Sequence, residues 1–405
     1  MKALVFHHPK DVRVESVPDP RIENARDVIV RVTSASITGE DLRVYNGHLP
    51  QRSGLVLGRE FMGVVVETGP RVRNLRKGDR VVVPPPIACG ECFFCARGLP
   101  TQCEKTGGAS FGRGGERASY DGGQAQYVRV PFADVGPRKV PDGLSDERAL
   151  FLSDTLPAAW AAAERCELKG GETVAVFGCG PAGLMAMRSA RLLGAARVIA
   201  VDVLAYRRAA ARRLAGAETL DPAAGHPPDA VRRMTGGRGA DACIDAVGME
   251  AEYGLRESVS NVLRLQVGTI RVLRAAISAV RRGGVVSVLG AYGAPAGDFP
   301  IDEIYEKGLR LRAGPAPVHA VIDRLLDMAA AGRLAAEDLV THRLPLDEAP
   351  EAYVMCSDRV EDCLKVVLKP WEQEAPLRAP SAESDEFGEE PLTSIDTGLI
   401  PPSVL

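Results

Sequence analysis

Four cysteines lie within one short segment of the sequence, CGECFFCARGLPTQC, at Cys89, Cys92, Cys95 and Cys103. Thiolates at this spacing are typical of a tetrahedral zinc site. Because the protein would supply all four ligands, no position stays open for a substrate or a water. The spacing therefore predicts a structural zinc. The other cysteines are scattered, and we expect them to be core residues; they are Cys166, Cys179, Cys243, Cys356 and Cys363.

A glycine-rich turn forms the second group, Gly178-Cys179-Gly180-Pro181-Ala182-Gly183, between the apolar run TVAVF and a helical pattern. Glycines in this context permit a tight turn and let a pyrophosphate approach the N-terminus of the helix. Asp202 follows the next apolar run, where its carboxylate would accept hydrogen bonds from the adenosine ribose. The pattern predicts that NAD(H) binds to Gly178, Gly180, Pro181, Gly183, Asp202 and Arg207. Arg207 and Arg208 would tolerate a 2′-phosphate, so NADP(H) stays open as an alternative.

Composition and charge restrict the class of protein. The chain has 405 residues, with 50 Lys and Arg against 53 Asp and Glu, which gives a net charge of −3. Nucleic-acid binding would need a basic patch, and none is evident. The N-terminal segment MKALVFHHPKDVRVE has the pattern of a strand rather than a signal peptide, and no apolar run is long enough to span a membrane. We expect a soluble cytoplasmic protein with reduced thiols, a small-molecule substrate, and a homodimeric or homotetrameric assembly.

The elements that must position these groups fall into four segments. Residues 1–153 contain many short runs of β-branched residues bounded by Gly or Pro, which indicates a barrel-like β domain. Residues 154–303 alternate apolar strands with helical patterns, which predicts an α/β domain with a doubly wound parallel sheet. Residues 304–370 contain a helix and a strand that we expect to return to the first domain. Residues 371–405 form an acidic, Pro-containing tail, which we expect to be extended or partly disordered, as a solvated tail or alternatively a docking arm.

Several motifs resemble the zinc-containing medium-chain alcohol dehydrogenases, and their formaldehyde-dehydrogenase-like branch in particular. They are PFADVGPRKVPDGLS, GGQAQYVRVP, IDAVGME and THRLPLDEAPEAY. The resemblance covers roughly residues 1–370. It implies a GroES-like catalytic domain, a Rossmann cofactor domain, an active site in the cleft between them, and hydride transfer at carbon.

The sequence departs from this family at the catalytic metal. Where the family has a Cys ligand, this chain has Thr38, and a Ser or Thr two positions on is replaced by Glu40. The His that often relays the proton is replaced by Arg43. In LGREFMGVVVETG the His ligand of the family is replaced by Arg59, which cannot lose its proton and therefore cannot bind a metal. The third ligand survives as Asp154 in LSDTLP, and Glu60 survives beside Arg59.

These replacements predict that catalytic zinc is lost, with a hard cation on Glu40, Glu60 and Asp154 as the alternative. Arg59 would either hold an oxyanion or a substrate carboxylate, or fill the vacated site by pairing with Asp154 or Glu60. Glu40 would either exchange a proton or form a salt bridge, for example with Arg43. Three acids around one arginine predict an acidic pocket, which favours a neutral or cationic substrate.

The sequence therefore predicts an NAD(H)-dependent oxidoreductase without catalytic zinc that retains a structural zinc. It would transfer a hydride to or from an iminium, an enal, a carbonyl or an alcohol. The predicted catalytic residues are Thr38, Glu40, Arg59, Glu60 and Asp154. Two alternatives stay open: a non-catalytic NAD-binding protein, and a redox-neutral enzyme with tightly held NAD.

Overall fold

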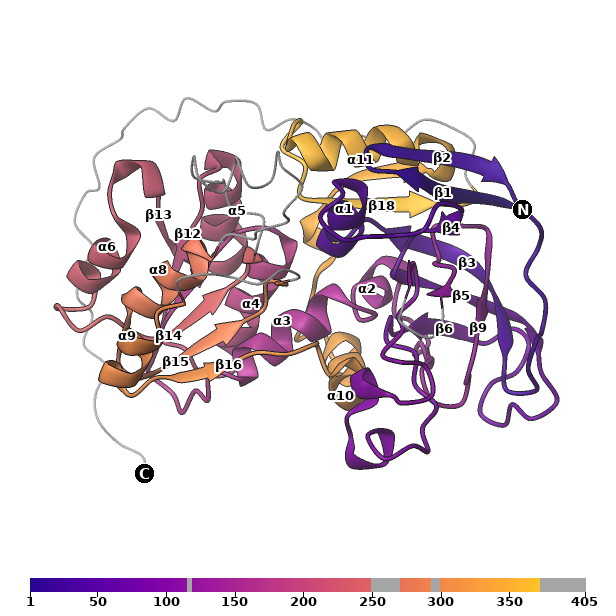
Figure 1. The fold of residues 1–405 in the computed structure, drawn as a ribbon, viewed down its shortest axis with the longest axis horizontal. Helices are drawn as coiled ribbons and strands as arrows, with labels where there is room; N and C mark the ends of the chain where they lie inside the picture. Colours follow the sequence, from indigo (N-terminus) through magenta and orange to yellow (C-terminus); the bar gives the residue numbers. More distant parts are fainter. Residues whose placement is uncertain (115–118, 249–269, 293–298, 372–405) are drawn as a thin grey trace, which may run out of the picture.

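The computed structural model describes residues 1–114, 119–248, 270–292 and 299–371. Figure 1 shows two bodies side by side, one built around a parallel sheet and the other around a barrel. The predicted acidic tail lies outside the described residues except for Trp371, whose indole N–H donates to the carbonyl of Val32 at 2.8 Å. No helix in the described part of the chain has both the length and the apolar character of a membrane span.

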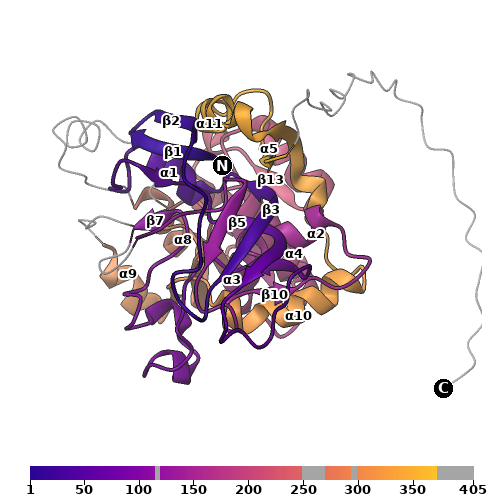
Figure 2. The same ribbon diagram turned by 90° about the vertical axis from the view of Figure 1, so that its right-hand side faces the viewer.

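The barrel body consists of a three-stranded sheet, β2-β1-β4, and a larger sheet in the order β10-β6-β5-β3-β18-β17, with β9 also paired to β3. Its strands are β1 (Lys2–His8), β2 (Asp11–Ser16), β3 (Val28–Ser36), β4 (Leu55–Val56), β5 (Glu60–Thr68), β6 (Arg80–Val83), β9 (Tyr127–Val130), β10 (Arg138–Lys139), β17 (Val340–Pro345) and β18 (Lys365–Lys369). A two-stranded sheet of β7 (Arg113–Gly114) and β8 (Ser119–Tyr120) lies apart from them. The barrel's helices are α1 (Gly39–Tyr45), α2 (Asp146–Leu150) and α11 (Ala349–Asp358), of which α11 lies beside β2 (Figure 2).

Strand β3 is central to the barrel because three other strands pair with it. Its run of β-branched residues suits a strand that is buried on both faces. The first half of β3 pairs with β9, its end pairs with β18, and β5 runs antiparallel along its other edge. The C-terminal segment of the chain thus completes a sheet that the N-terminal segment begins.

In the residues that the structure describes, the second body has six parallel strands in the order β13-β12-β11-β14-β15-β16, which confirms the predicted Rossmann sheet. The strands are β11 (Thr173–Phe177), β12 (Arg197–Val201), β13 (Glu218–Leu220), β14 (Ala240–Asp245), β15 (Val280–Val288) and β16 (Arg310–Arg312). The helices are α4 (Pro181–Leu192), α5 (Ala205–Ala215), α6 (Pro227–Met234), α8 (Arg271–Ala279) and α9 (Ile301–Lys307). Strand β16 lies beyond residue 303, where the sequence placed the end of this domain, so the parallel sheet extends further than expected.

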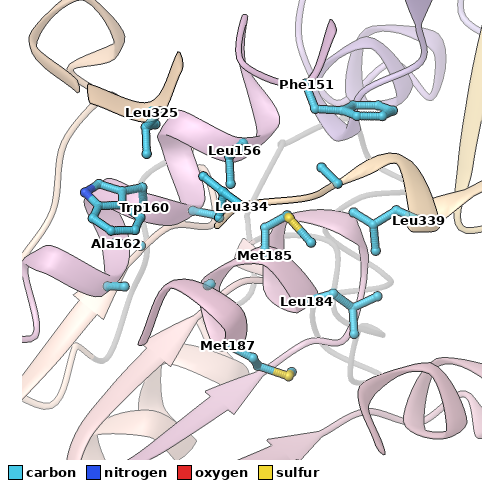
Figure 3. Packing of buried hydrophobic residues seen from close by; sticks show 14 of the residues in the cluster. Phe151, Leu156, Trp160, Ala162, Leu184, Met185, Met187, Leu325, Leu334 and Leu339 are labelled. Carbon is cyan, nitrogen blue, oxygen red and sulfur yellow. The ribbon is translucent and has the colours of Figure 1, made fainter. Parts of the chain in front are cut away.

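Helices α3 (Thr155–Glu164) and α10 (Val318–Ala330) belong to one apolar cluster with α4. Figure 3 shows Leu156 and Trp160 of α3 beside Met185 of α4, with Leu325 of α10 nearby. The cluster also includes Met62 of β5, so buried apolar residues connect the barrel to the parallel sheet. This continuous packing restricts the movement of the α3 N-terminus, where Asp154 is located.

His319 lies in the first turn of α10, and its buried imidazole should make the protein less stable in acid. Neither ring nitrogen has a hydrogen-bond partner among the described residues, and burial, with the charge of Arg138, lowers its pKa to about 4. In the unfolded state the pKa of His319 is near 6.5. Between pH 6.5 and pH 4 the unfolded state therefore binds more protons than the folded state, so stability falls as the pH falls through this range. At pH 5 the loss should be about 2 kcal/mol relative to pH 7.5.

In His319→Phe, the fall in the free energy of unfolding between pH 7.5 and pH 5 should be smaller than in the wild type by about 2 kcal/mol. Urea unfolding at the two pH values measures this difference. His226→Gln is the control because His226 is exposed at the start of α6. Equal acid losses in the wild type and His319→Phe would contradict the assignment.

Candidate active site

The glycine turn between β11 and α4 has the geometry that its sequence predicts. Gly178 has φ +99°, and a Cβ there would lie 2.7 Å from Val247 Cγ2. A Cβ on Gly183 would overlap the carbonyl oxygen of Gly178. At Gly180, in contrast, the nearest atom to a Cβ would be a guanidinium nitrogen of Arg207 at 3.6 Å. Two glycines are therefore required by packing, while the third leaves open space at the N-terminus of α4, where backbone N–H groups can bind an anion.

Asp202 connects the turn to the end of β12. Its Oδ2 accepts a hydrogen bond from the N–H of Cys179 at 2.7 Å, and its Oδ1 accepts one from the N–H of Leu204 at 2.8 Å. Each carboxylate oxygen keeps a second lone pair for a ribose hydroxyl. The carboxylate thus fixes the conformation of the turn at the end of β12.

The two arginines after Asp202 have different environments. Arg208 donates to the carbonyls of Asp202 and Val203, and its guanidinium pairs with Asp221 at 2.7 Å. Arg207 lies against Gly180, and its Nε donates to the hydroxyl of Tyr206 at 3.2 Å. Arg207 is therefore the one of the two that stands beside the glycine turn, while Arg208 is already paired.

The four predicted zinc ligands converge. All four Sγ atoms lie within 4.8 Å of one another, with 4.0 Å between the sulfurs of Cys89 and Cys95 and between those of Cys92 and Cys103. A tetrahedron with Zn–S distances near 2.3 Å requires sulfurs about 3.8 Å apart. Backbone N–H groups of Cys89, Glu91 and Cys92 point at sulfurs of the cluster. Within the described ranges it is the one group of His, Cys, Asp or Glu side chains close enough to hold a metal.

Arg59 lies just before β5 and forms ion pairs with two acids from other elements. Its Nε is 2.8 Å from Oδ2 of Asp154, which precedes α3, and its Nη1 pairs with Oε2 of Glu40 in α1. The side chain is only 14% exposed. Gly58 has φ +103°, and a Cβ there would overlap Gln124, so the backbone before Arg59 is fixed. Glu40 also accepts from Nη1 of Arg113 at 3.0 Å, which makes an alternating series of Arg113, Glu40, Arg59 and Asp154.

Thr38 has a structural contact in this site. It is the N-cap of α1, and its Oγ1 and backbone N–H each lie 2.8 Å from Oδ2 of Asp41. The N–H of Asp41 in turn donates to Thr38 Oγ1, which completes a capping box. The Thr38 hydroxyl, which the sequence predicts to be catalytic, thus also forms the N-cap of α1.

Glu60 is completely buried and pairs with a lysine that no sequence motif singles out. Its Oε2 is 2.6 Å from Nζ of Lys365, the first residue of β18, and also accepts from Ser36 of β3. Its Oε1 accepts from the N–H of Thr155 at 2.7 Å. Lys365 also donates to the carbonyl of Ile37 at 3.0 Å. The available signal was a lysine within the apolar run CLKVVL, which becomes informative only when β18 is known to lie beside β3.

The cations bring the charge of the site close to balance. The acids Glu40, Glu60 and Asp154 face Arg59, Arg113 and Lys365. The prediction of an acidic pocket did not count Arg113 and Lys365, which pair with two of its three acids. Glu40 forms ion pairs with Arg59 and Arg113, where the sequence suggested a pair with Arg43.

Burial separates the proton affinities of the acids. Burial raises the pKa of Asp41 to about 6, against the hydrogen bonds from Thr38. It also raises the pKa of Asp154, although Arg59 opposes the effect. Burial acts in the same direction on Glu40, but the charges of Arg59 and Arg113 outweigh it and lower the pKa of Glu40. Glu40 is thus held ionised, whereas Asp154 binds a proton more readily than an ordinary aspartate.

A barrel joined to a six-stranded Rossmann sheet, with a glycine turn and a four-cysteine cluster, defines the class of medium-chain dehydrogenases. Residues 24–142 match the alcohol dehydrogenase GroES-like domain, and residues 181–261 match the zinc-binding dehydrogenase family. The chain belongs to the zinc-type medium-chain alcohol dehydrogenase family, a family of NAD(P)-dependent oxidoreductases.

Individual relatives match along nearly the whole chain. An uncharacterized zinc-type alcohol dehydrogenase-like protein of Bacillus subtilis is 40% identical over 91% of this chain and 100% of the relative. A zinc-type alcohol dehydrogenase-like protein of Schizosaccharomyces pombe is 33% identical over 87% of each chain. The structure of the alcohol dehydrogenase TADH from Thermus sp. ATN1 has a TM-score of 0.80 and 39% identity, and covers 91% of this chain and 99% of that one.

Proposed function

We propose that this protein is an NAD(H)-dependent oxidoreductase in which Arg59 occupies the place of the catalytic zinc. The observation that carries the proposal is the ion pairing of one guanidinium with both Glu40 and Asp154. The resemblance of the motifs matches Arg59 and Asp154 to two metal ligands of the family. A guanidinium stays protonated and offers only donors, so this position cannot ligate a metal.

The residues around Arg59 support hydride chemistry on a small carbonyl, alcohol, iminium or enal. The nicotinamide cofactor supplies or accepts the hydride when it is bound. An N–H of Arg59 that is not used by Asp154 or Glu40 can donate to a substrate oxygen and stabilise negative charge there. Asp154, whose pKa is raised by burial, is the group that exchanges a proton with the substrate. Glu40 stays ionised and holds the guanidinium in position.

The four cysteines fit a zinc that stabilises their loop. The near-tetrahedral spacing of their sulfurs and the N–H groups aimed at them suit thiolate ligands. With four protein ligands, such an ion has no open position for a substrate, so its role is in folding.

Metal content tests this proposal directly. Purified wild type should hold one zinc per chain, and Cys92→Ser should lose it, because the cluster supplies the ligands. The double variant Thr38→Cys with Arg59→His restores two family ligands beside Asp154 and should gain a second zinc. Zinc is counted by plasma emission spectrometry, and turnover is followed by NADH absorbance with a panel of aldehydes, imines and alcohols.

The outcomes distinguish a site in which Arg59 contributes to the reaction from a zinc site that has only lost its ligands. Loss of the wild-type activity in the zinc-loaded double variant would support Arg59 as the working group. A second zinc in the wild type that disappears in Asp154→Asn would overturn the proposal. NADH binding without turnover on any member of the panel would favour a non-catalytic NAD-binding protein.

Asp202 is the residue through which we propose a preference for NADH over NADPH. Asp202→Ala should weaken NADH binding about tenfold, through loss of charge-assisted hydrogen bonds to the ribose, and should affect NADPH less. Asp202→Asn is the matched comparison because it keeps an acceptor for the N–H of Cys179, while it removes the charge and replaces the acceptor that faces the N–H of Leu204 by a donor. Both affinities are measured by fluorescence titration. Tighter binding of NADPH by the wild type would refute the preference.

A further inference from the structure

Two cysteines outside the metal cluster form a close pair. Cys356 lies in the last turn of α11 and Cys363 lies two residues before β18, and their Sγ atoms are 3.3 Å apart. Their distance in the sequence gave no sign of this contact, and both were expected to be isolated core thiols. Cys363 is 3% exposed, whereas Cys356 is partly exposed. A disulfide requires the sulfurs to approach by only about 1.3 Å more, to a bond length near 2.0 Å.

The surroundings of the pair favour a thiolate. The hydrogen bond from Cys356, with Thr341 and the positive charges of Arg207 and Lys365, lowers the pKa of Cys363 against the effect of burial. The pKa of Cys356 is raised by the same hydrogen bond. The proton of the pair is thus shared, and one sulfur ionises more easily than an isolated thiol.

The segment that connects the two cysteines contains three non-glycine residues with positive φ. Arg359, Glu361 and Asp362 have φ values of 58°, 54° and 50°, in the left-handed region that non-glycine residues seldom adopt. The N–H of Cys363 donates to the carbonyl of Val360 at 3.1 Å, so the turn and the second cysteine move together.

The backbone of Cys363 contacts the cofactor domain. Its carbonyl accepts from the hydroxyl of Tyr206 at 3.2 Å, and the same hydroxyl accepts from Nε of Arg207. Arg207 lies against Gly180 in the glycine turn. A shift of the Cys363 backbone therefore acts on the hydrogen bond that orients Arg207.

We propose that Cys356 and Cys363 are a redox-sensitive dithiol that a peroxide converts to a disulfide, and that this disulfide weakens dinucleotide binding through Tyr206 and Arg207. The effect on the dinucleotide rests on the proposed cofactor function, whereas disulfide formation does not.

The chemistry balances with hydrogen peroxide as the oxidant. The ionised sulfur attacks one peroxide oxygen, the O–O bond breaks, and the departing hydroxide takes a proton to become water. The resulting sulfenic acid is attacked by the second thiol, the S–S bond forms, and a second water leaves. Two thiols lose two electrons and the peroxide gains them. A dithiol reductant reverses the change.

Peptide mass spectrometry of the zinc-loaded protein tests the disulfide. Trypsin cuts after Arg343, Arg359 and Lys365, so the two cysteines fall on peptides 344–359 and 360–365. After mild peroxide treatment and alkylation, we expect these peptides to be joined, to separate on reduction, and to stay apart in Cys356→Ser. Cys166→Ser is the control with the pair intact, and zinc release is followed with a chromophoric chelator. Failure to find the joined peptides while the zinc cluster is being oxidised would overturn the proposal.

NADH titration of the oxidised and reduced protein tests the coupling. The expected result is a Kd about threefold to tenfold higher after oxidation, the effect of a perturbed hydrogen bond, with no change in Cys356→Ser. Joined peptides with an unchanged Kd would overturn the coupling and leave the disulfide established. Absence of NADH binding in the reduced wild type would count against the proposed function instead.

Discussion

Replacing Arg59 by Met should destabilise the protein by about 3–5 kcal/mol, because it leaves two poorly exposed carboxylates without their shared cation. Glu40 and Asp154 come from different elements, and the guanidinium lies between them. Met replaces the aliphatic part of the Arg side chain and carries no charge, so the effect reports the loss of the guanidinium that pairs with both acids. We also expect turnover to fall at a low temperature at which the variant stays folded, because no other donor in the series lies between the two acids. Urea unfolding and steady-state kinetics measure the two effects.

Arg113→Met is the matched control for this experiment. Arg113 pairs with the same Glu40, but its side chain is 48% exposed. An exposed ion pair contributes less than about 1 kcal/mol, so this variant should remain close to the wild type. If Arg59→Met and Arg113→Met had the same small effect, the guanidinium of Arg59 would not be what stabilises Glu40 and Asp154, and the proposed site would be wrong.

Lys365→Met should destabilise the protein about as much as Arg59→Met, because it leaves Glu60 without its cation. Lys365 is 2% exposed and Glu60 is completely buried, so removing the ammonium leaves a carboxylate that water cannot reach. The expected loss is about 3–5 kcal/mol. Ser36 and the N–H of Thr155 still donate to Glu60, but they carry no charge to offset it. Urea unfolding at neutral pH measures the loss.

A double variant and a neighbouring lysine provide the controls. Glu60→Gln removes the charge that Lys365 neutralises, so Glu60→Gln with Lys365→Met should cost less than the sum of the two single variants. Lys369→Met, at the other end of β18, removes a lysine that donates to Ser34 and is 18% exposed, and should cost much less. Additive losses in the double variant would mean that the two side chains do not interact.

The sequence predicted those parts of the molecule whose signals are local. The glycine turn, the strand before it and Asp202 lie within one short segment, and the geometry of a strand, a turn and a helix follows from residues next to each other in the chain. The four cysteines are likewise fixed by spacing within one loop. The position of Arg59 came from the family resemblance, since no local rule predicts an arginine there.

The partners of the charged residues could not be predicted in the same way. Glu60 and Lys365 meet because β3 lies between β5 and β18, with Ser36 paired to Glu60 on one side and to Val367 on the other. Neither register is visible in the sequence of one strand. An acidic pocket was predicted because Glu40, Glu60 and Asp154 lie in segments that resemble motifs of the family. Arg113 and Lys365 lie outside those segments and come close to the acids only in the folded chain.

The last strand of the barrel has a consequence for synthesis on the ribosome. Strand β3 ends at residue 36, but its neighbour β18 is made only at residues 365–369. All six strands of the parallel sheet lie between residues 173 and 312, so that sheet is complete while the barrel still lacks two strands. Because domains fold as units during translation, the nascent chain carries a finished cofactor domain behind an open-edged barrel. Until Lys365 emerges, Glu60 lacks the cation with which it pairs in the folded barrel, and the edge of β3 that β18 later covers exposes unpaired backbone groups.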